Sequence, residues 1–238
     1  MPKFDNHLLL FNLAVSIFGI ILTIALTFNP PFALEPERIP WRKTLICSIF
    51  SLICFFGIIA AIFPKQCSKK FHFKEKTSVS QKFYDNFKGH HPACKEFSAH
   101  VIKLNNHVLC AACIGMILGA SMALSGMAFY LFGLWQIENI SKPLILVGVA
   151  GVTLGFFQLK FRGIARSILN AAFVFGAFLI LIGFDVLTQN LFFDLFLILL
   201  IILWLFTRIE LSRWDHLKIC RRCKLPCEIY GLRKGGIV

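Results

Sequence analysis

Four residues able to bind a metal ion stand in two close pairs near the middle of the chain. Their spacing is His91-x2-Cys94-x15-Cys110-x2-Cys113, and the second pair opens a strongly apolar segment. Imidazole nitrogen and thiolate sulfur are the ligands of tetrahedral zinc sites, in which two such pairs are commonly separated by about fifteen residues. The sequence therefore predicts a zinc site here, with His90 as an alternative ligand to its neighbour His91.

A second set of metal-binding residues follows the last apolar segment. The set is His216-x3-Cys220-x2-Cys223-x3-Cys227, and several Arg and Lys residues lie around it. The Cys220–Cys223 pair is its best signal, because His216 can instead belong to the end of a helix that leaves the membrane near Trp214. We expect zinc at this second set as well.

Other metal centres use the same thiols. Cys110, Cys113, Cys220 and Cys223 together form a candidate four-thiolate centre that would tie the tail to the third apolar segment. An iron–sulfur cluster on the cysteines of this face is the alternative cofactor.

Redox chemistry is the competing class. Cys110-x-x-Cys113 stands at the expected N-terminus of a helix, where the helix dipole stabilises a thiolate for thiol–disulfide exchange. A catalytic metal would need an open coordination position and a nearby acid or base. The only carboxylates close in sequence, Glu96 and Asp85, stand in no recognisable motif.

The elements that position these residues are membrane spans. Hydrophobic residues make up 57% of the 238, and the mean hydropathy is +0.73, whereas a soluble domain is roughly 45–50% apolar. A bilayer is crossed by about 20 apolar residues. Six runs approach this length: 8–28, 44–63, 110–132, 142–157, 168–187 and 191–206. The sequence therefore predicts an all-α membrane protein with six transmembrane helices, the first retained rather than cleaved as a signal peptide.

The distribution of cations predicts the orientation. Of 25 Lys and Arg residues, 21 fall in the N-terminus, residues 64–109, residues 158–167 and the chain after 207. Cations near the ends of spans are retained on the cytoplasmic side. We therefore expect a multi-pass protein of the cell membrane with both termini in the cytoplasm, where thiols stay reduced and bind metal rather than form disulfides.

The net charge of +13 follows from the same topology. Anionic lipid of the inner leaflet attracts juxtamembrane Lys and Arg, so the expected partner is the bilayer, and nucleic acid is not expected. Four segments are predicted: residues 1–63 with two spans, 64–109 as a cytoplasmic loop with the His/Cys module, 110–207 with four spans, and 208–238 as a basic Cys-rich tail.

The loop is expected to contain a β-hairpin. Residues 99–104 and 107–109 flank Asn105-Asn106, which tolerate the left-handed conformation of a two-residue turn. This hairpin places Leu104 opposite His107 and about 13 Å from His100, so the two histidines cannot bind one metal. Each is expected to be an exposed strand residue. The hairpin returns the second Cys pair towards the first, as in a zinc ribbon.

Small residues predict how the helices pack. Gly115, Gly119 and Ala123 recur every four residues on one face, and Gly148, Gly151 and Gly155 do so in the next span. In lipid such faces allow close backbone contact and a gain in dispersion energy. Cys47 and Cys54, inside the second span, are expected to be packing residues.

Residues 110–119, CAACIGMILG, resemble the Cys-Ala-Arg-Cys-Thr-Gly-x-Tyr-x-Gly signature of a family of prokaryotic predicted membrane proteins of unknown function. Residues 89–92 are similar to that family's Cys-His-Gln-x-Pro element, with Gly89 in place of its Cys. Ala112 and Ile114 also depart from the signature. The resemblance implies a membrane location and a Cys/His site, and no known activity.

These observations favour a non-enzymatic function. In the leading hypothesis, zinc holds the cytoplasmic face in one shape, as a docking platform for a protein partner or as a metal-responsive element. The alternative is a membrane thiol oxidoreductase or metalloenzyme that acts on a lipid or thiol substrate.

Overall fold

Six long apolar helices make up most of the protein. The computed structural model describes residues 6–30, 40–63, 87–88, 95–104, 107–134 and 137–222. The helices are α1 (Asn6–Phe28), α2 (Arg42–Ile62), α4 (Ala111–Leu131), α5 (Ser141–Phe156), α6 (Gly163–Thr188) and α7 (Leu191–Arg222). Each is long and apolar enough to cross a membrane, and a helix satisfies its backbone hydrogen bonds internally, as lipid requires. The prediction of a six-span, all-α membrane protein is confirmed.

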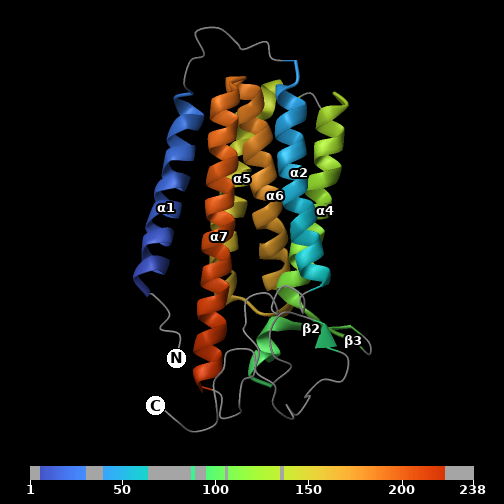
Figure 1. Ribbon diagram of the computed structural model, residues 1–238, viewed down its shortest axis with the longest axis vertical. Helices are drawn as coiled ribbons and strands as arrows, with labels where there is room; N and C mark the ends of the chain where they lie inside the picture. Colours follow the sequence, from blue (N-terminus) through green and yellow to red (C-terminus); the bar gives the residue numbers. More distant parts are fainter. Residues whose placement is uncertain are drawn as a thin grey trace, which may run out of the picture.

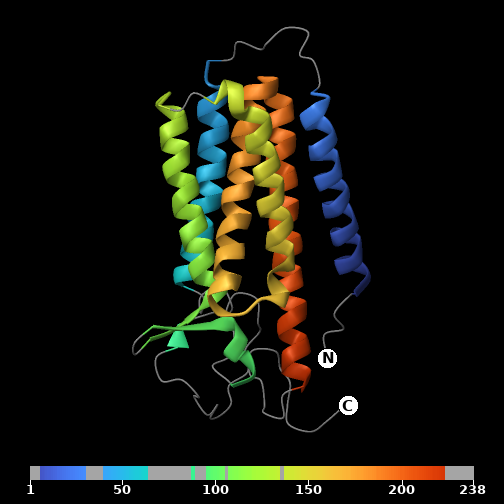
Figure 2. The ribbon, with the colours of Figure 1, turned by 180° about the vertical axis from the view of Figure 1, so that it is seen from behind.

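The helices run alternately up and down in one bundle (Figures 1 and 2). The start of α1 and the end of α7 lie at the same end, together with the strands. We call this end the β end and the opposite one the far end. The arrangement agrees with an even number of membrane crossings.

Helix α6 occupies the centre of the bundle, between α4 and α5. A Cβ atom at Gly119 of α4 would lie 2.6 Å from the carbonyl oxygen of Ala171, and one at Gly148 of α5 would lie 2.6 Å from that of Gly176. These distances leave no room for a side chain, so the backbones touch directly. The predicted small-residue faces are confirmed as packing surfaces, and Gly176 is their unpredicted counterpart on α6.

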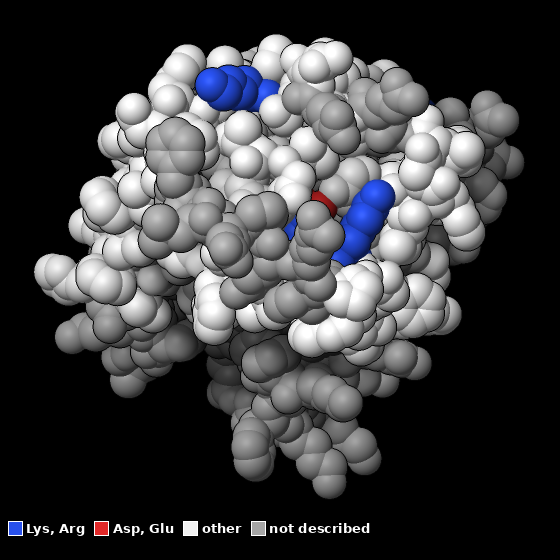
Figure 3. Space-filling view, turned by 90° about the horizontal axis from the view of Figure 1, so that it is seen from above, with Lys and Arg blue, Asp and Glu red and all other residues white. Residues whose placement is uncertain are grey.

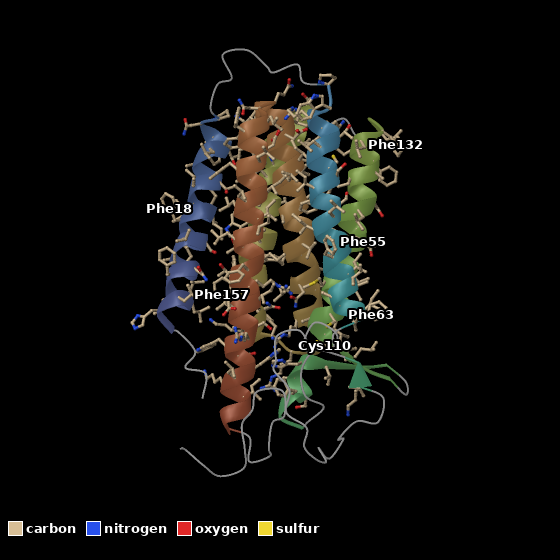
Figure 4. All side chains as sticks on the ribbon, viewed as in Figure 1. Phe18, Phe55, Phe63, Cys110, Phe132 and Phe157 are labelled. Atoms are coloured by element: carbon tan, nitrogen blue, oxygen red, sulfur yellow. The ribbon has the colours of Figure 1, made fainter. Side chains whose placement is uncertain are left out.

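The outside of the bundle is covered by large apolar side chains. Phe18 on α1, Phe55 on α2 and Phe132 after α4 point away from the bundle (Figure 4) and are 64%, 54% and 79% exposed. A surface of this kind is suited to lipid rather than water. The bilayer is therefore the natural surroundings of the helices.

The face of α2 opposite to the exposed Phe55 is buried inside the bundle. Ile46, Cys47, Phe50 and Cys54 are at most 4% exposed, and Phe50 lies against Phe178 of α6 with ring centroids 6.4 Å apart. Cys47 and Cys54 therefore pack in the core, as predicted.

A small sheet lies at the β end. Its strands are β1 (Phe87–Lys88), β2 (Val101–Leu104) and β3 (His107–Cys110), in the order β1-β3-β2. Strands β2 and β3 form the predicted hairpin, with Leu104 opposite His107. Strand β1, which the sequence did not predict, pairs with β3 in parallel. The 3-10 helix η1 (Lys95–His100) leads directly into β2.

Helix α7 is longer than its apolar run. Its 32 residues extend about 48 Å at 1.5 Å per residue, whereas the hydrocarbon core is about 30 Å thick. The helix continues without a break past residue 207, where the tail was expected to begin. Its last turns therefore project beyond the apolar bundle at the β end.

The chain turns sharply between α6 and α7. Gln189 adopts the left-handed conformation that ends α6, with φ of 49°. Asn190 then accepts a hydrogen bond from the backbone N–H of Phe193 through its side-chain oxygen, at 3.1 Å, and so caps the start of α7. This short turn places Asp185, near the end of α6, beside Asp194, in the first turn of α7.

Candidate functional site

Cys110 lies where the sheet meets the helical bundle (Figure 4). It is the last residue of β3, pairs with Val101 of β2 and precedes the first residue of α4 with an extended backbone. Its side chain is 1% exposed. The predicted Cys pair therefore spans a junction between two kinds of structure, with Cys110 in the strand and Cys113 in the first turn of the helix.

The first turns of α4 pack against the start of α6. Gly115 lies against the backbone of Ser167 and the Cβ atom of Asn170, and Asn170 donates a hydrogen bond to the carbonyl oxygen of Arg166 at 2.7 Å. Cys113, half a turn before Gly115, is partly buried. The second Cys of the pair thus starts α4 close to the polar first turns of α6.

Three rings from two distant segments form a cluster below this junction. Phe97 and His100 belong to η1, and His216 belongs to α7. Their ring centroids are 5.3 to 5.4 Å apart, and the two contacts of Phe97 are edge-on. All three side chains are at most 5% exposed. The cluster fixes η1 on the projecting end of α7.

Arg166 of α6 connects this cluster to an acidic group. Its Nη1 atom lies 2.9 Å from Nε2 of His100, and its Nη2 atom lies 3.6 Å from Oδ2 of Asp215 on α7. A guanidinium group only donates hydrogen bonds, so Nε2 of His100 accepts from Arg166, and the same Nε2 atom lies 3.5 Å from Oδ2 of Asp215. Arg166 is 1% exposed. Its buried charge is balanced by the neighbouring carboxylate.

Arg208 is a second buried cation in the same layer. It is 4% exposed and lies on α7, with its guanidinium carbon 5.3 Å from the ring centroid of Phe173 on α6. The β end therefore contains two buried cations, Arg166 and Arg208.

The structure describes part of the two predicted ligand sets. Cys110, Cys113 and His216 have described side chains, and Cys220 is described only as a position on α7, one turn after His216. His91, Cys94, Cys223 and Cys227 lie outside the described residues. Within residues whose side chains are described, no three His, Cys, Asp or Glu side chains come together as a metal site.

The expectation that His100 is an exposed strand residue is wrong. His100 ends η1, one residue before β2, and it is 5% exposed. Its burial is explained by Phe97, His216 and Arg166, which enclose the ring from two other helices and its own. For His216, the alternative that it belongs to the end of the last helix agrees with the structure, since α7 includes it, and its role as a metal ligand stays a prediction.

An open depression lies beside the hairpin, at the start of α6. It has a volume of about 450 Å³ and is lined by Ser98, Ala99, Val101, Arg162 and Gly163. Gly163 has a φ of +50°, a conformation that favours glycine. This turn brings the exposed Arg162 to the edge of the sheet.

A separate ionic cluster ties four helices together at the far end. Arg42 of α2 is hydrogen-bonded to Asp194 of α7, and its Nη1 atom lies 2.7 Å from Oδ1 of Asp185 on α6. Tyr130 of α4 donates a hydrogen bond to Asp185, and Lys43 lies 3.9 Å from the centroid of the Tyr130 ring. Seen from this end, acidic atoms lie recessed on a face that also carries basic side chains (Figure 3).

Only part of the signal for these clusters is present in the sequence. Asp185 and Asp194 stand near the ends of the last two apolar runs, and no local pattern pairs them with Arg42. The available clue was that Arg42 and the two aspartates carry opposite charges at the ends of spans on the same side of the membrane. Arg166 and Arg208 were treated as juxtamembrane cations, and their burial has no signal in a single sequence.

No protein-family model, curated protein or solved structure matches the chain.

Proposed function

We propose that this multi-pass membrane protein binds zinc at its β end through His91, Cys94, Cys110 and Cys113. In this proposal the metal is structural. It joins the sheet to α4 and keeps the β end in one shape, either to dock a protein partner or to change that shape when the metal is lost. The observation that carries the proposal is the position of Cys110, buried where β2, β3 and α4 meet.

The described strands support bringing the two pairs of ligands together. Strand β1 ends at Lys88, which pairs with Leu109. Leu109 is the residue directly before Cys110. His91 follows Lys88 by three residues, a distance of at most about 11 Å in extended chain. On the other side, Cys94 directly precedes η1, which leads into Val101, the partner of Cys110. The described elements on the two sides of 89–94 are thus β1, which pairs with the strand that ends in Cys110, and η1, which leads into the other neighbour of that strand.

A second zinc centre at His216, Cys220, Cys223 and Cys227 is proposed with it. His216 and Cys220 are four residues apart on α7, and residues at this spacing lie on the same helix face. The alternative of a four-thiolate centre shared with Cys110 and Cys113 is also compatible with α7 ending at the β end. Mutating each set separately and measuring the zinc remaining distinguishes the two.

The test of the proposal is metal analysis combined with thiol labelling. Purified protein should contain one or two zinc ions per chain, and Cys110 and Cys113 should resist alkylation until a chelator is added, because coordinated thiolate is held and occupied. Mass spectrometry of labelled peptides gives the result for each thiol. Iron with visible absorbance would support the cluster alternative instead.

One observation favours a second candidate function, that of a thiol oxidoreductase. Cys110 and Cys113 stand at the N-terminus of α4, where the helix dipole favours a thiolate. For this function we expect rapid alkylation of one thiol in metal-free, reduced protein without any chelator. Metal-free protein with two equally unreactive thiols would contradict both candidates.

We further propose that the β end faces the cytoplasm of the cell in which the protein resides. The β end carries Lys103 on β2, Lys160 and Arg162 between α5 and α6, and Arg213 and Lys218 near the end of α7. The far end carries Arg42 and Lys43 at the start of α2 and Lys142 at the start of α5. This distribution follows the positive-inside rule. The interior face is also the side on which reduced thiols are available for metal.

A topology map tests the orientation. In the protein with all its cysteines, an epitope tag inserted within residues 31–39 should be accessible to an antibody in intact cells, and a tag at the C-terminus only after permeabilisation. Reporter fusions at the two termini should both indicate the cytoplasm. Termini on opposite sides of the membrane would contradict the six-span topology itself.

A further inference from the structure

The open depression at the start of α6 combines a cation and a hydroxyl group in its wall. Ser98, Ala99 and Val101 line it from η1 and β2, and Arg162 and Gly163 line it from the start of α6. Its volume of about 450 Å³ falls within the range of about 300–1,000 Å³ of small-molecule sites. Among the described residues that line it, none is acidic. The depression is therefore suited to an anion.

Two further cations stand next to the depression. Lys160 ends the 3-10 helix η3 (Phe157–Lys160), two residues before Arg162, and Lys103 follows Val101 by two residues on β2. The side chains of Lys103, Lys160 and Arg162 are all exposed, so their charges are accessible to a group that approaches from outside. A guanidinium group binds two phosphate oxygens at once. The charges therefore favour a phosphate group as the anion.

The depression opens at the surface of the membrane. The connection between α5 and α6 lies at the β end, beside the sheet (Figure 2). The candidate spans on its two sides are Ser141–Lys160 and Gly163–Thr188, so only residues 161 and 162 separate them. The hydrocarbon layer of the membrane thus begins close to Arg162. The phosphate groups of phospholipids lie in the polar layer directly outside the hydrocarbon, at the depth of this guanidinium group.

An apolar surface adjoins the depression on the side of the hydrocarbon layer. Most of α6 is buried, yet Ile164 and Ile168 in its first turns are 66% and 62% exposed. They are four residues apart and therefore share one face of the helix. At 1.5 Å per residue, Ile168 lies about 9 Å along the chain from Arg162. A phospholipid with its phosphate at Arg162 can place its acyl chains on this face, whereas a soluble phosphate makes no use of it.

We propose that the depression binds the headgroup of an anionic phospholipid from the membrane leaflet at the β end. Arg162 and Lys160 bind the phosphate, Ser98 donates a hydrogen bond to the headgroup, and the acyl chains lie along Ile164 and Ile168. The lipid contacts both the sheet and α6, so it attaches the β end to the membrane surface. This site does not depend on the proposed zinc, and it gives one lipid a fixed position beyond the general attraction of cations to the bilayer.

Photo-crosslinking of the full-length protein tests this proposal. The protein is reconstituted in phosphatidylcholine nanodiscs with a trace of phosphatidylglycerol that carries a photoreactive acyl chain, and labelled peptides are identified by mass spectrometry. Labelling of residues 161–169 should exceed at least fivefold the labelling by a phosphatidylcholine probe with the same chains. Arg162→Met should lower the phosphatidylglycerol labelling to the level of the phosphatidylcholine probe. Ser98→Asp, which adds a negative charge from the opposite wall, should do the same.

Arg213→Met is the matched control, because it removes a cation that is 54% exposed on α7 at the same end, and it should leave the labelling unchanged. Inorganic phosphate in large excess, at constant ionic strength, should not reduce the labelling. A reduction would assign the depression to a soluble phosphate and overturn the proposal. Equal labelling of the parent by the two probes, or equal phosphatidylglycerol labelling of the parent and Arg162→Met, would also overturn it.

Discussion

Replacing Cys113 with Ser should lower the stability of the purified protein far more than the same replacement at Cys47. Cys113 is a proposed metal ligand at the junction between the β end and α4. Apparent zinc binding energies of about 10–16 kcal/mol in small modules are folding energies, so loss of one ligand removes a large part of this stabilisation. Cys47 packs in α2 at 1% exposure, and a serine hydroxyl there can bond to the carbonyl of the preceding turn.

The measurement is thermal unfolding in detergent with and without chelator. The parent protein and the Cys47→Ser variant should both lose stability when the chelator is added, whereas Cys113→Ser should already melt low and respond little. Cys54→Ser, in the same buried face of α2, provides a second control. If both variants melt alike and the chelator does not affect the parent, the metal site is absent.

The lengths of the apolar runs were sufficient to predict the helices. They did not predict the residues at which the helices end. The last run ends at residue 206 because Thr207 and Arg208 follow it, yet α7 continues to Arg222. A run of apolar residues ends where the surroundings change from lipid to water, whereas a helix ends where its backbone hydrogen bonds or its packing contacts end. Contacts of His216 with η1 hold the extra turns in place, and these contacts depend on residues more than 100 positions away.

In the sheet at the β end, too, one part was predictable from the sequence and another was not. Asn105-Asn106 between two apolar stretches was a local signal, and it predicted the register of β2 and β3 correctly. Strand β1 has only two residues and exists through its pairing with β3, so no local pattern indicates it. The burial of His100 likewise depends on Arg166, 66 residues later. The hairpin of β2 and β3 was thus predictable from neighbouring residues, whereas β1 and the burial of His100 depend on tertiary contacts.

The zinc ligands at residues 91, 94, 223 and 227 lie outside the described residues, so they stay predictions. What the structure adds is the surroundings of Cys110, Cys113 and His216. A strand end, a helix start and two buried arginines meet there, and the spacing of Cys residues in the sequence contains none of this information. In the proposed site, buried positive charge nearby would favour thiolate over thiol.

At the far end, replacing Arg42 with Met should destabilise the protein by about 3–5 kcal/mol, the range for breaking a buried ion pair from one side. Arg42 is the cation shared by Asp185 and Asp194, and the Asp194 side chain is fully buried. Without the guanidinium group, two adjacent carboxylates would remain inside the bundle. Because α2, α6 and α7 each supply one of the charges, the loss affects the packing of all three helices.

The size of the effect is best measured by unfolding the detergent-solubilised protein with increasing SDS. Lys142→Met, at an exposed position of the same end, is the matched control and should change stability by no more than about 0.5 kcal/mol. Adding Asp185→Asn and Asp194→Asn to Arg42→Met should restore most of the loss, because the buried negative charges are then removed together with their partner. A triple variant as unstable as Arg42→Met alone would show that Arg42 stabilises the bundle by packing rather than by charge.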